Sequence, residues 1–482
     1  MRDTVASRVA GPASVPTVSD LRPTGQPFVR QLLHRLRHAR IAGACAVGLA
    51  LLAGCAGEPP PPAPRSIILL DIDTLRADHL GCYGYGLPTS PNIDALAAES
   101  VRFEWAFGQA PYTAPSQGSL LTGLYPTAHG LVLPSDRMHE EVTTLAETLA
   151  AAGFATAGFV DGGHMAADFG IGQGFQLYHN ADRGGLAGMA PRVLDWLGEH
   201  ADERFLLLIH TYDVHTPYDP PEPYRSQFLA GLDPPTPGFT ASAKQLRDIR
   251  VSKYHGSEEL LPPNDVAYAR ALYDGGIRHA DEWIGTYLTE IRRLGLDRKA
   301  MIVLFSDHGE EFQEHGSVLH EKLYATVTRI PLLIRFPGGA RRGTVSTVVE
   351  GIDLTPTLLD AVGVDPAPGL HGESLLPLIE GERPSRPPLA FGESPFFGVE
   401  RFVATDEYRL QYSRIHDRVE LYSYREDPHE QRDLADERSA VVERMWPAIA
   451  RWEAFVVPAR RRTARGPLSD ETRKQLEALG YL

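Results

Sequence analysis

The sequence predicts an α/β fold: a large, mostly parallel sheet flanked by helices, followed by a small antiparallel sheet in a C-terminal subdomain. Apolar runs of strand length alternate with helical segments, as expected of parallel strands joined by crossover helices. Three of these runs lead directly into acidic or histidine residues. Because the carboxyl ends of parallel strands meet at one edge of a sheet, we expect those polar residues to converge there.

The elements follow this alternation along the chain. Residues 66–72 have the pattern of a buried strand and run straight into Asp73. Further strands are expected at 154–160, 205–210, 300–306 and 330–336, and helices at 92–99, 142–152, 265–294 and 354–361. The short runs 402–405, 408–412 and 420–424 indicate an antiparallel addition after about residue 385. The polar, proline-containing residues 233–253 predict a surface loop over the site.

Composition excludes several classes of protein. The chain has 482 residues, a formal charge of −15 and 43% hydrophobic residues, which is typical of a globular protein with one large core and a smaller partner. The first 54 residues hold seven arginines and two aspartates, so the remainder carries about −20. Such an acidic body is a poor partner for nucleic acid. Three cysteines are too few for a disulfide framework.

The N-terminus has the features of a targeting segment. Arginines between residues 30 and 40 precede an apolar run at 41–52, which is too short to span a membrane. The run ends in Leu52-Ala53-Gly54-Cys55, which resembles a bacterial lipobox with Cys55 as the lipidation site. An ordinary signal peptide with an incidental cysteine is the alternative. Residues 1–29 show no amphipathic period, which leaves an over-extended start open.

This segment predicts where the protein resides. Residues 1–54 would form a lipoprotein signal peptide, and the Pro-rich residues 55–65 an extended tether that holds the body off a membrane. We therefore expect a lipoprotein of the bacterial cell envelope, facing the periplasm or the surface and attached to a membrane through its lipid.

The polar strand ends suit a divalent metal ion. Asp73 follows a buried strand, and the pair Asp307-His308 follows another, so hard carboxylates stand beside an imidazole. A third strand end, residues 210–215, contains two histidines and an aspartate. Each motif alone also fits a capped turn or a loop with local hydrogen bonds.

A longer motif makes the assignment specific. The segment Thr113-Ala114-Pro115-Ser116-Gln117 and the following Leu-Thr-Gly resemble the signature of the sulfatase family, in the alkaline phosphatase superfamily. Other segments resemble that family in the same order: residues 72–81, 125–130, 210–218, 307–316, 372–378 and 420–428. The resemblance implies an alkaline-phosphatase-like catalytic domain at 66–385 and a C-terminal α+β subdomain at 386–482.

The resemblance also implies roles for individual residues. One divalent metal ion would be held by Asp73, Thr113, Asp307 and His308. His215 would contact a non-bridging oxygen of the substrate. Either His320 or Lys322 would assist the leaving group, and Gln117 occupies the position of the signature arginine.

Several residues depart from the family pattern. True sulfatases oxidise the signature Cys or Ser to formylglycine, whereas oxidation of Thr113 would yield a ketone, so we expect the threonine hydroxyl itself to be the nucleophile. Gln117 is neutral where arginine is usual, and Thr74 replaces a second acidic ligand. The remaining imidazole favours Zn or Mn, with Ca as the alternative. Asp71 shares a strand face with Asp73 and would lie behind the metal ligands, bind a second ion, or be a strand-end surface charge.

These departures leave four functions open. Family relatives with threonine at this position act on phosphate or phosphonate esters, which favours phosphoester hydrolysis by Thr113. The alternatives are a sulfuric ester hydrolase, a phospho-group transferase of the cell envelope, and a non-catalytic lipoprotein that binds anionic ligands. The substrate would be a small-molecule, glycan or lipid ester, selected by loops at 161–173, 233–253 and 394–400.

Overall fold

The computed structural model describes residues 63–481, apart from residues 182–183, 385, 397–398 and 458–465. The predicted signal peptide, Cys55 and most of the Pro-rich tether lie outside the described residues. Among the helices that are described, none combines the length and the hydrophobicity that crossing a membrane requires.

A nine-stranded sheet forms the centre of the fold, in the order β10-β2-β9-β6-β1-β5-β3-β4, with β11 also paired to β2. Every strand except β9 runs in the same direction. The strands are β1 (Ser66–Ile72), β2 (Val101–Phe107), β3 (Ala155–Val160), β4 (Leu177–Asn180), β5 (Phe205–Thr211), β6 (Ala300–Phe305), β9 (Arg329–Arg335), β10 (Gly343–Val345) and β11 (Val349–Glu350).

The predicted mostly parallel sheet is confirmed, and the direction of β9 has a local cause. Between β6 and β9 the chain forms only the β7–β8 hairpin (Glu311–Phe312 and Val318–Leu319) and the short helix α10 (Ala325–Thr328). No crossover helix returns the chain to the opposite edge, so β9 runs back beside β6.

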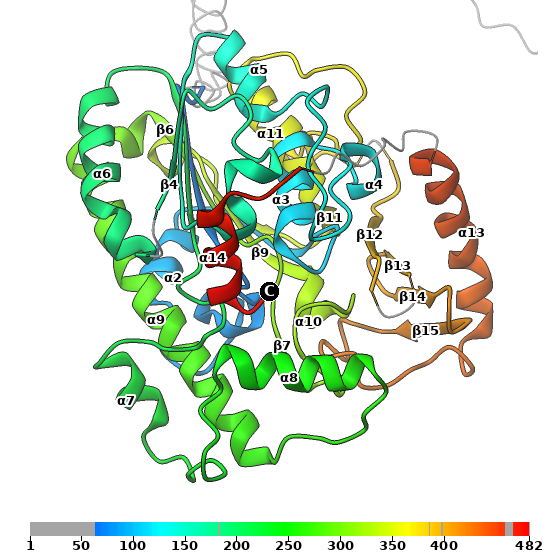
Figure 1. Cartoon of the computed structure of the whole chain (residues 1–482). Helices are drawn as coiled ribbons and strands as arrows, with labels where there is room; N and C mark the ends of the chain where they lie inside the picture. Colours follow the sequence, from blue (N-terminus) through cyan, green and yellow to red (C-terminus); the bar gives the residue numbers. More distant parts are fainter. Residues whose placement is uncertain (1–62, 182–183, 385, 397–398, 458–465, 482) are drawn as a thin grey trace, which may run out of the picture. The chain divides into compact units, whose positions relative to one another are not determined.

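Helices cover both faces of this sheet (Figure 1). Alternate residues of the central strands point to opposite faces, so Ile68 and Leu70 join one core while Ile67 and Leu69 join the other. The first core includes α2 (Pro91–Ala97), α6 (Gly185–His200) and α9 (Pro263–Arg293). The second core includes α3 (Thr113–Thr122), α5 (Leu145–Ala151), α11 (Leu354–Ala361) and α14 (Asp470–Leu479). The remaining helices are α4 (Pro126–His129), α7 (Tyr224–Leu229), α8 (Ala243–Tyr254), α12 (Leu376–Ile379) and α13 (Ser439–Val456).

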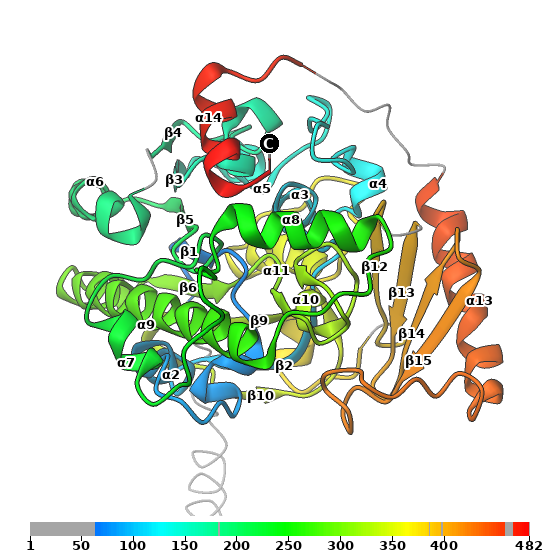
Figure 2. The ribbon, with the colours of Figure 1, turned by 60° about the horizontal axis from the view of Figure 1, so that its bottom comes forward.

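The antiparallel addition predicted after residue 385 is a four-stranded sheet beside the large one (Figure 2). Its strands are β12 (Ala390–Ser394), β13 (Glu400–Ala404), β14 (Arg409–Ser413) and β15 (Arg418–Tyr422). Helix α13 packs on this sheet through Met445 and Ile449, which contact Val403, Leu410 and Leu421. The domain boundary at residue 385 stays a prediction.

The predicted loop at 233–253 is wrong in its second half, because α8 starts at Ala243. Ser242 accepts a hydrogen bond from the Gln245 amide, and the Gln245 side chain returns to the Ser242 amide. This reciprocal capping box starts a helix in a segment whose polarity alone indicates a loop.

A buried ion pair ties the second sheet to the first. Arg409 Nη1 lies 3.1 Å from Glu430 Oε2, and both side chains are fully buried. Glu430 Oε2 also accepts a hydrogen bond from the Ala325 amide at 2.7 Å, at the start of α10. The carboxylate of Glu430 thus joins β14 to the start of α10, the helix that leads into β9.

We expect Glu430→Ala to lower the free energy of unfolding by about 3–5 kcal/mol, because it leaves the Arg409 guanidinium buried and unpaired. Denaturant titration of the purified protein measures this change. The exposed pair Arg432–Glu437 provides the control, since Glu437→Ala should cause no measurable change. Equal effects of the two substitutions would contradict this account of the interface.

Candidate active site

Asp73 stands at the carboxyl end of β1, where hydrogen bonds hold a strained turn. Its amide donates to Thr211 O on β5 at 3.1 Å. Thr74 follows with a φ of 58°, which is unfavourable for a β-branched residue. The Thr74 hydroxyl donates to Asp73 O, and Tyr273 Oη donates to Thr74 O, both at 2.7 Å. Thr74 therefore stabilises the turn with its hydroxyl, and the Asp73 carboxylate is left to face Thr113.

Thr113 is the first residue of α3 and is fully buried. Its Oγ1 donates to Asp73 Oδ2 at 3.1 Å and lies 3.5 Å from His308 Nε2. Helix N-termini present free amide groups and the positive end of the helix dipole. This position therefore favours negative charge on Oγ1 or on an anion bound next to it.

Asp307 and His308 follow β6, and each orients the other. The His308 amide donates to Asp307 Oδ1 at 2.9 Å. His308 Nδ1 lies 3.0 Å from Gly309 O, and since a carbonyl oxygen only accepts, Nδ1 carries the proton. His308 Nε2 then presents a lone pair, 3.4 Å from Asp307 Oδ2. A Cβ on Gly309 would lie 2.3 Å from Thr326 O, so this turn requires glycine.

These residues fit a divalent cation. Ligand atoms of Asp73, Asp307 and His308 all lie within 4.8 Å of one another. The nearest separations in the cluster, 3.1 to 3.5 Å, match the roughly 3.0–3.5 Å expected between ligands bound at about 2.1 Å from one ion. Asp73 Oδ1 and Asp307 Oδ2 are buried without a hydrogen-bond partner. Burial, reinforced by Asp307, raises the pKa of Asp73, and a bound cation would remove that cost.

Two further histidines present ring nitrogens next to Thr113. His215 Nδ1 lies 2.5 Å from Thr216 O, so Nδ1 is the protonated nitrogen and Nε2 accepts. Tyr481 Oη donates to that Nε2 at 2.9 Å. His320 Nε2 lies 3.0 Å from the same hydroxyl oxygen. Because the Tyr481 proton already serves His215, His320 Nε2 must carry a proton of its own.

Glu310 orients His320. Its Oε1 lies 3.1 Å from His320 Nδ1, and its Oε2 accepts from Tyr218 Oη at 2.8 Å. Burial raises the pKa of Glu310 to about 7 and lowers the pKa of His320, so one proton is shared between the carboxyl group and Nδ1. In either arrangement Nε2 keeps its proton. The pair therefore offers an acid directed at the site.

Lys322 lies apart from this cluster. Its Nζ donates to His315 O at 2.7 Å, whereas the ring of His320 lies 4.5 Å from that of His308, centroid to centroid. The structure thus brings only His320 of the two candidates to the site.

Gln117 is directed at Asp71. Its Nε2 donates to Asp71 Oδ2 at 2.5 Å, and both residues are buried. The interpretation of Asp71 as a strand-end surface charge is therefore wrong: parallel pairing on both sides of β1 encloses it. Burial and the nearby Asp307 raise its pKa. Gln117 steadies a buried carboxyl group that adjoins the cluster.

Comparison with known proteins shows the family of this arrangement. The sequence model of the sulfatase family matches residues 65–364. This chain belongs to the sulfatase family. The model of the C-terminal region of N-sulphoglucosamine sulphohydrolase matches residues 313–453, across β13–β15 and most of α13. The chain is accordingly a sulfatase-family ester hydrolase.

Individual relatives agree with this assignment. The ulvan-active sulfatase of Formosa agariphila is 27% identical over 403 residues, which cover 77% of each chain. Arylsulfatase A of Homo sapiens is 28% identical over 373 residues, which cover 69% of this chain and 70% of the relative.

Solved structures of the family share the fold. BT4656, in complex with its substrate D-glucosamine-2-N,6-O-disulfate, has a TM-score of 0.69 at 19% identity, covering 82% of this chain and 98% of that one. The phosphonate monoester hydrolase of Agrobacterium radiobacter has a TM-score of 0.66 at 20% identity, covering 81% and 95%. The predicted α/β architecture with its small antiparallel sheet is confirmed.

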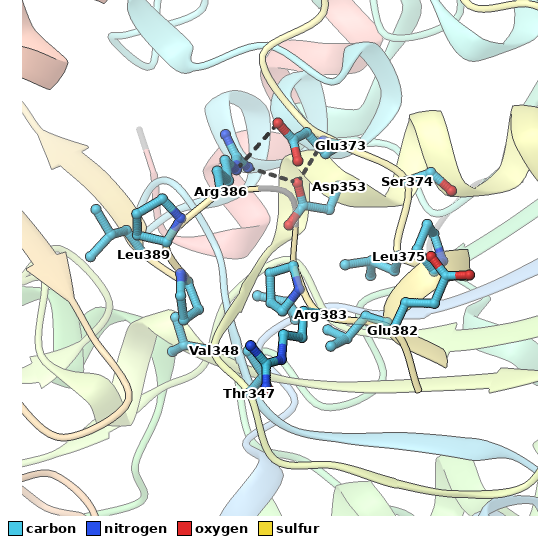
Figure 3. A pocket seen from close by; sticks show the side chains of 16 residues that line it. Thr347, Val348, Asp353, Glu373, Ser374, Leu375, Glu382, Arg383, Arg386 and Leu389 are labelled. Atoms are coloured by element: carbon cyan, nitrogen blue, oxygen red, sulfur yellow. Dashed lines mark hydrogen bonds and ion pairs between the residues drawn. The ribbon is translucent and has the colours of Figure 1, made fainter. Parts of the chain in front are cut away.

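A pocket of about 200 Å³ adjoins His320 in this sulfatase-family site. The three segments expected to select the substrate each contribute one of its lining residues: His164, Arg250 and Phe396. Another pocket, of about 210 Å³, contains none of the site residues (Figure 3). There Arg386 pairs with Asp353 at 3.2 Å and also contacts Glu350, so its charge is matched within the protein.

Sequence reasoning assigned no role to four residues of the site. Glu310 lies in a matched segment, but its hydrogen bond to His320 depends on the β7–β8 hairpin. His210 Nε2 lies 3.4 Å from Asp73 Oδ2, and both of its ring nitrogens are buried without a hydrogen bond. His164 and Tyr481 come from segments with no recognisable motif. Only the paired strand ends and the docked α14 bring them to Thr113.

We expect His320→Ala to lower kcat by an amount that depends on the leaving group of the substrate. Loss of a general acid should lower kcat by about 10²–10⁴-fold for sugar or alkyl esters, which need a proton on the departing oxygen. Para-nitrophenolate leaves without protonation, so kcat for para-nitrophenyl esters should fall by about tenfold or less. Lys322→Ala is the control and should affect both substrates equally. A uniform loss in the His320 variant would assign the histidine to binding only.

Proposed function

We propose that this chain hydrolyses sulfuric esters, with Thr113 as the nucleophile. The observation that carries the proposal is the buried contact of Thr113 Oγ1 with Asp73 Oδ2 and His308 Nε2, at the N-terminus of α3. The sulfatases of Formosa agariphila and Homo sapiens resemble this chain over most of its length, which supports sulfate as the transferred group.

The residues divide the reaction between them. Asp73, Asp307, His308 and Thr113 would hold a divalent cation, which when bound lowers the pKa of the hydroxyl and offsets the charge of the substrate. Thr113 Oγ1 passes its proton to Asp73 Oδ2 and attacks the sulfur atom. The bond from sulfur to the ester oxygen breaks, and that oxygen takes the proton of His320 Nε2. His215 would donate to a non-bridging oxygen after it gains a second proton, at Nε2, which the charge of the bound anion favours. Water then gives a proton to His320 Nε2 and attacks the sulfur of the Thr113 ester. The bond from sulfur to Oγ1 breaks, Oγ1 regains a proton from Asp73, and sulfate leaves.

Phosphoester or phosphonate ester hydrolysis is the second candidate, and Thr113 itself favours it. A threonine cannot become formylglycine, so its covalent ester must be broken by a second attack at the central atom. The phosphonate monoester hydrolase of Agrobacterium radiobacter shares the fold, which is consistent with this chemistry on the same scaffold. A phospho-group transferase would share the first step and differ in the acceptor.

A substrate panel distinguishes these candidates. Metal-loaded protein is assayed with para-nitrophenyl sulfate, para-nitrophenyl phosphate, a phosphodiester and a phosphonate monoester, and the kcat/KM values are compared. A sulfuric ester hydrolase should prefer the sulfate by at least about tenfold. Preference for a phosphorus ester supports the second candidate, and transfer of label from Thr113 to an added alcohol indicates a transferase. Binding without turnover of any ester would indicate the non-catalytic alternative.

The metal and the natural substrate follow as narrower inferences. Two carboxylates, one hydroxyl and one imidazole favour Zn or Mn over Ca, because an imidazole nitrogen is a poor ligand for Ca. Metal analysis of the purified protein tests this order. BT4656 has a disulfated glucosamine as its substrate. In the adjoining pocket Arg250 lies 3.4 Å from Glu321, so an acidic sugar would have to take the place of that carboxylate beside the guanidinium.

We further infer that Cys55 carries a lipid that attaches the protein to a membrane of the bacterial cell envelope. The basic segment, the short apolar run and Leu52-Ala53-Gly54-Cys55 support this inference. Expression of Cys55→Ala in a bacterial host should move the protein from the membrane fraction to the soluble fraction. Unchanged fractionation, with no incorporation of labelled fatty acid in the parent protein, would refute the anchor.

A further inference from the structure

Tyr481, two residues after α14, lies inside the active site. Tyr481 Oη lies 2.9 Å from His215 Nε2 and 3.0 Å from His320 Nε2. The Thr113 hydroxyl lies near enough to act on the pKa of this phenol. A single phenol oxygen therefore occupies the space between the proposed nucleophile, the proposed oxyanion ligand and the proposed acid.

The docking of α14 is supported by close packing against the 3-10 turn η3 (Gly163–Met165). Gln475 Oε1 accepts from the Gly163 amide at 3.1 Å. A Cβ on Gly162 would lie 2.3 Å from Gln475 Oε1, and one on Gly163 would lie 2.6 Å from Leu479 Cδ1. The two glycines thus provide the room in which α14 lies. Tyr481 itself packs edge-on against His164, with ring centroids 4.3 Å apart.

With the segment in this position, the catalytic groups are sealed from solvent. Thr113, Asp73 and His308 are 0% exposed. His215 and His320 are 3% and 2% exposed. The adjoining pocket is bounded by Tyr481 and His320, and Thr113 does not line it. Figure 1 shows α14 lying in front of the carboxyl edge of the sheet, near the end of the chain trace.

The Tyr481 hydroxyl lies where an oxygen of the transferred group would have to lie, between the ring nitrogens of His215 and His320. Thr113 Oγ1 must approach the central atom of the ester, and His215 and His320 must contact its oxygens. One oxygen at hydrogen-bonding distance from both histidines, beside Thr113, excludes a tetrahedral anion from the same space.

We propose that Tyr481 is an internal plug: its hydroxyl occupies an oxygen position of the transferred group, and residues 466–481 must be displaced before substrate reaches Thr113. This inference rests on the proposed function only in requiring that the site bind a tetrahedral oxyanion. The apparent affinity for such an anion is reduced by the fraction of molecules in which the plug is docked.

The test measures anion binding directly. Orthovanadate is titrated calorimetrically into full-length, metal-loaded protein carrying Tyr481→Ala, Tyr481→Phe or Gln475→Ala. We expect at least about tenfold tighter binding by Tyr481→Ala, because the competing hydrogen bonds are gone, and a smaller gain by the other two variants. Tyr83→Phe is the control, since the Tyr83 hydroxyl donates to Phe103 O outside the site. Hydrogen exchange of the parent protein should show that vanadate exposes the amides of residues 470–481.

The outcomes separate this inference from the proposed hydrolase. Tighter vanadate binding by the Tyr481→Ala variant without turnover of any ester would support the plug and refute the hydrolase. Unchanged or weaker binding by folded Tyr481→Ala protein, verified by its thermal melt, would overturn the plug and place Tyr481 among the anion ligands. Full protection of residues 470–481 at saturating vanadate, or no binding by either protein, would also overturn it.

Discussion

Replacement of Thr113 by alanine should lower kcat by at least about 1000-fold on every ester that the protein cleaves. The substitution removes the oxygen that contacts Asp73 and His308, while the ligand atoms of Asp73, Asp307 and His308 stay in place. The metal affinity of the variant should therefore remain within about tenfold of that of the parent protein. Initial rates combined with metal analysis of the same sample measure both quantities.

Two companion variants sharpen this result. Thr113→Ser keeps the hydroxyl and should retain measurable turnover, together with a labelled residue 113 after quenching. Thr122→Ala removes the hydroxyl at the other end of α3, which donates to Gly118 O within the helix, and should leave kcat unchanged. If Thr113→Ala protein kept full activity, an external water would be the nucleophile and the proposed covalent route would be wrong.

Asp307→Asn should change stability in opposite directions with and without metal. In the metal-free protein, Asp71, Asp73 and Asp307 are fully buried, and the charge of Asp307 raises the pKa of the other two. Asparagine removes one of these charges, and its side-chain oxygen can still accept from the His308 amide. We expect the metal-free variant to be more stable than the metal-free parent by about 1–2 kcal/mol.

With metal, the order should reverse. The parent gains more stability the more tightly it binds the metal. The variant has lost a charged ligand and should bind the metal at least about 100-fold more weakly. Thermal melts with a chelator and with added Zn or Mn measure both effects. Asp281→Asn is the matched control: this buried carboxylate caps α2 and lies outside the cluster, so its loss should destabilise both forms equally. If the metal-free Asp307→Asn protein were less stable than the metal-free parent, repulsion among the three buried aspartates would not be what limits the stability of the metal-free site.

The strand ends explain why much of the site is predictable. Uniformly apolar runs identify β1, β5 and β6, and parallel pairing then brings their carboxyl ends to one edge. Asp73, Asp307 and His308 meet there because each directly follows, or nearly follows, its strand. Thr113 is located by its motif, and its place at the start of α3 follows from the helix that begins with it.

Elements that depend on distant contacts are not predictable in this way. The direction of β9 depends on a connection that stays at one edge of the sheet, and its apolar pattern is the same for either direction. Lys322 and His320 stand two residues apart, and only the folded hairpin places one of them beside His308 and directs the other at His315 O. Gln117 could face the nucleophile or Asp71, and packing of α3 against β1 decides for Asp71.

The sequence by itself determined the family, the strands that lead into the cluster and the chemical types of the ligands, because local patterns and directly adjacent residues encode them. Tertiary structure alone decided that His320 rather than Lys322 lies in the site, that Glu310 contacts it, and that Tyr481 fills the space beside Thr113. These features depend on hydrogen bonds across 10 and 161 residues of chain, and no local periodicity records such contacts.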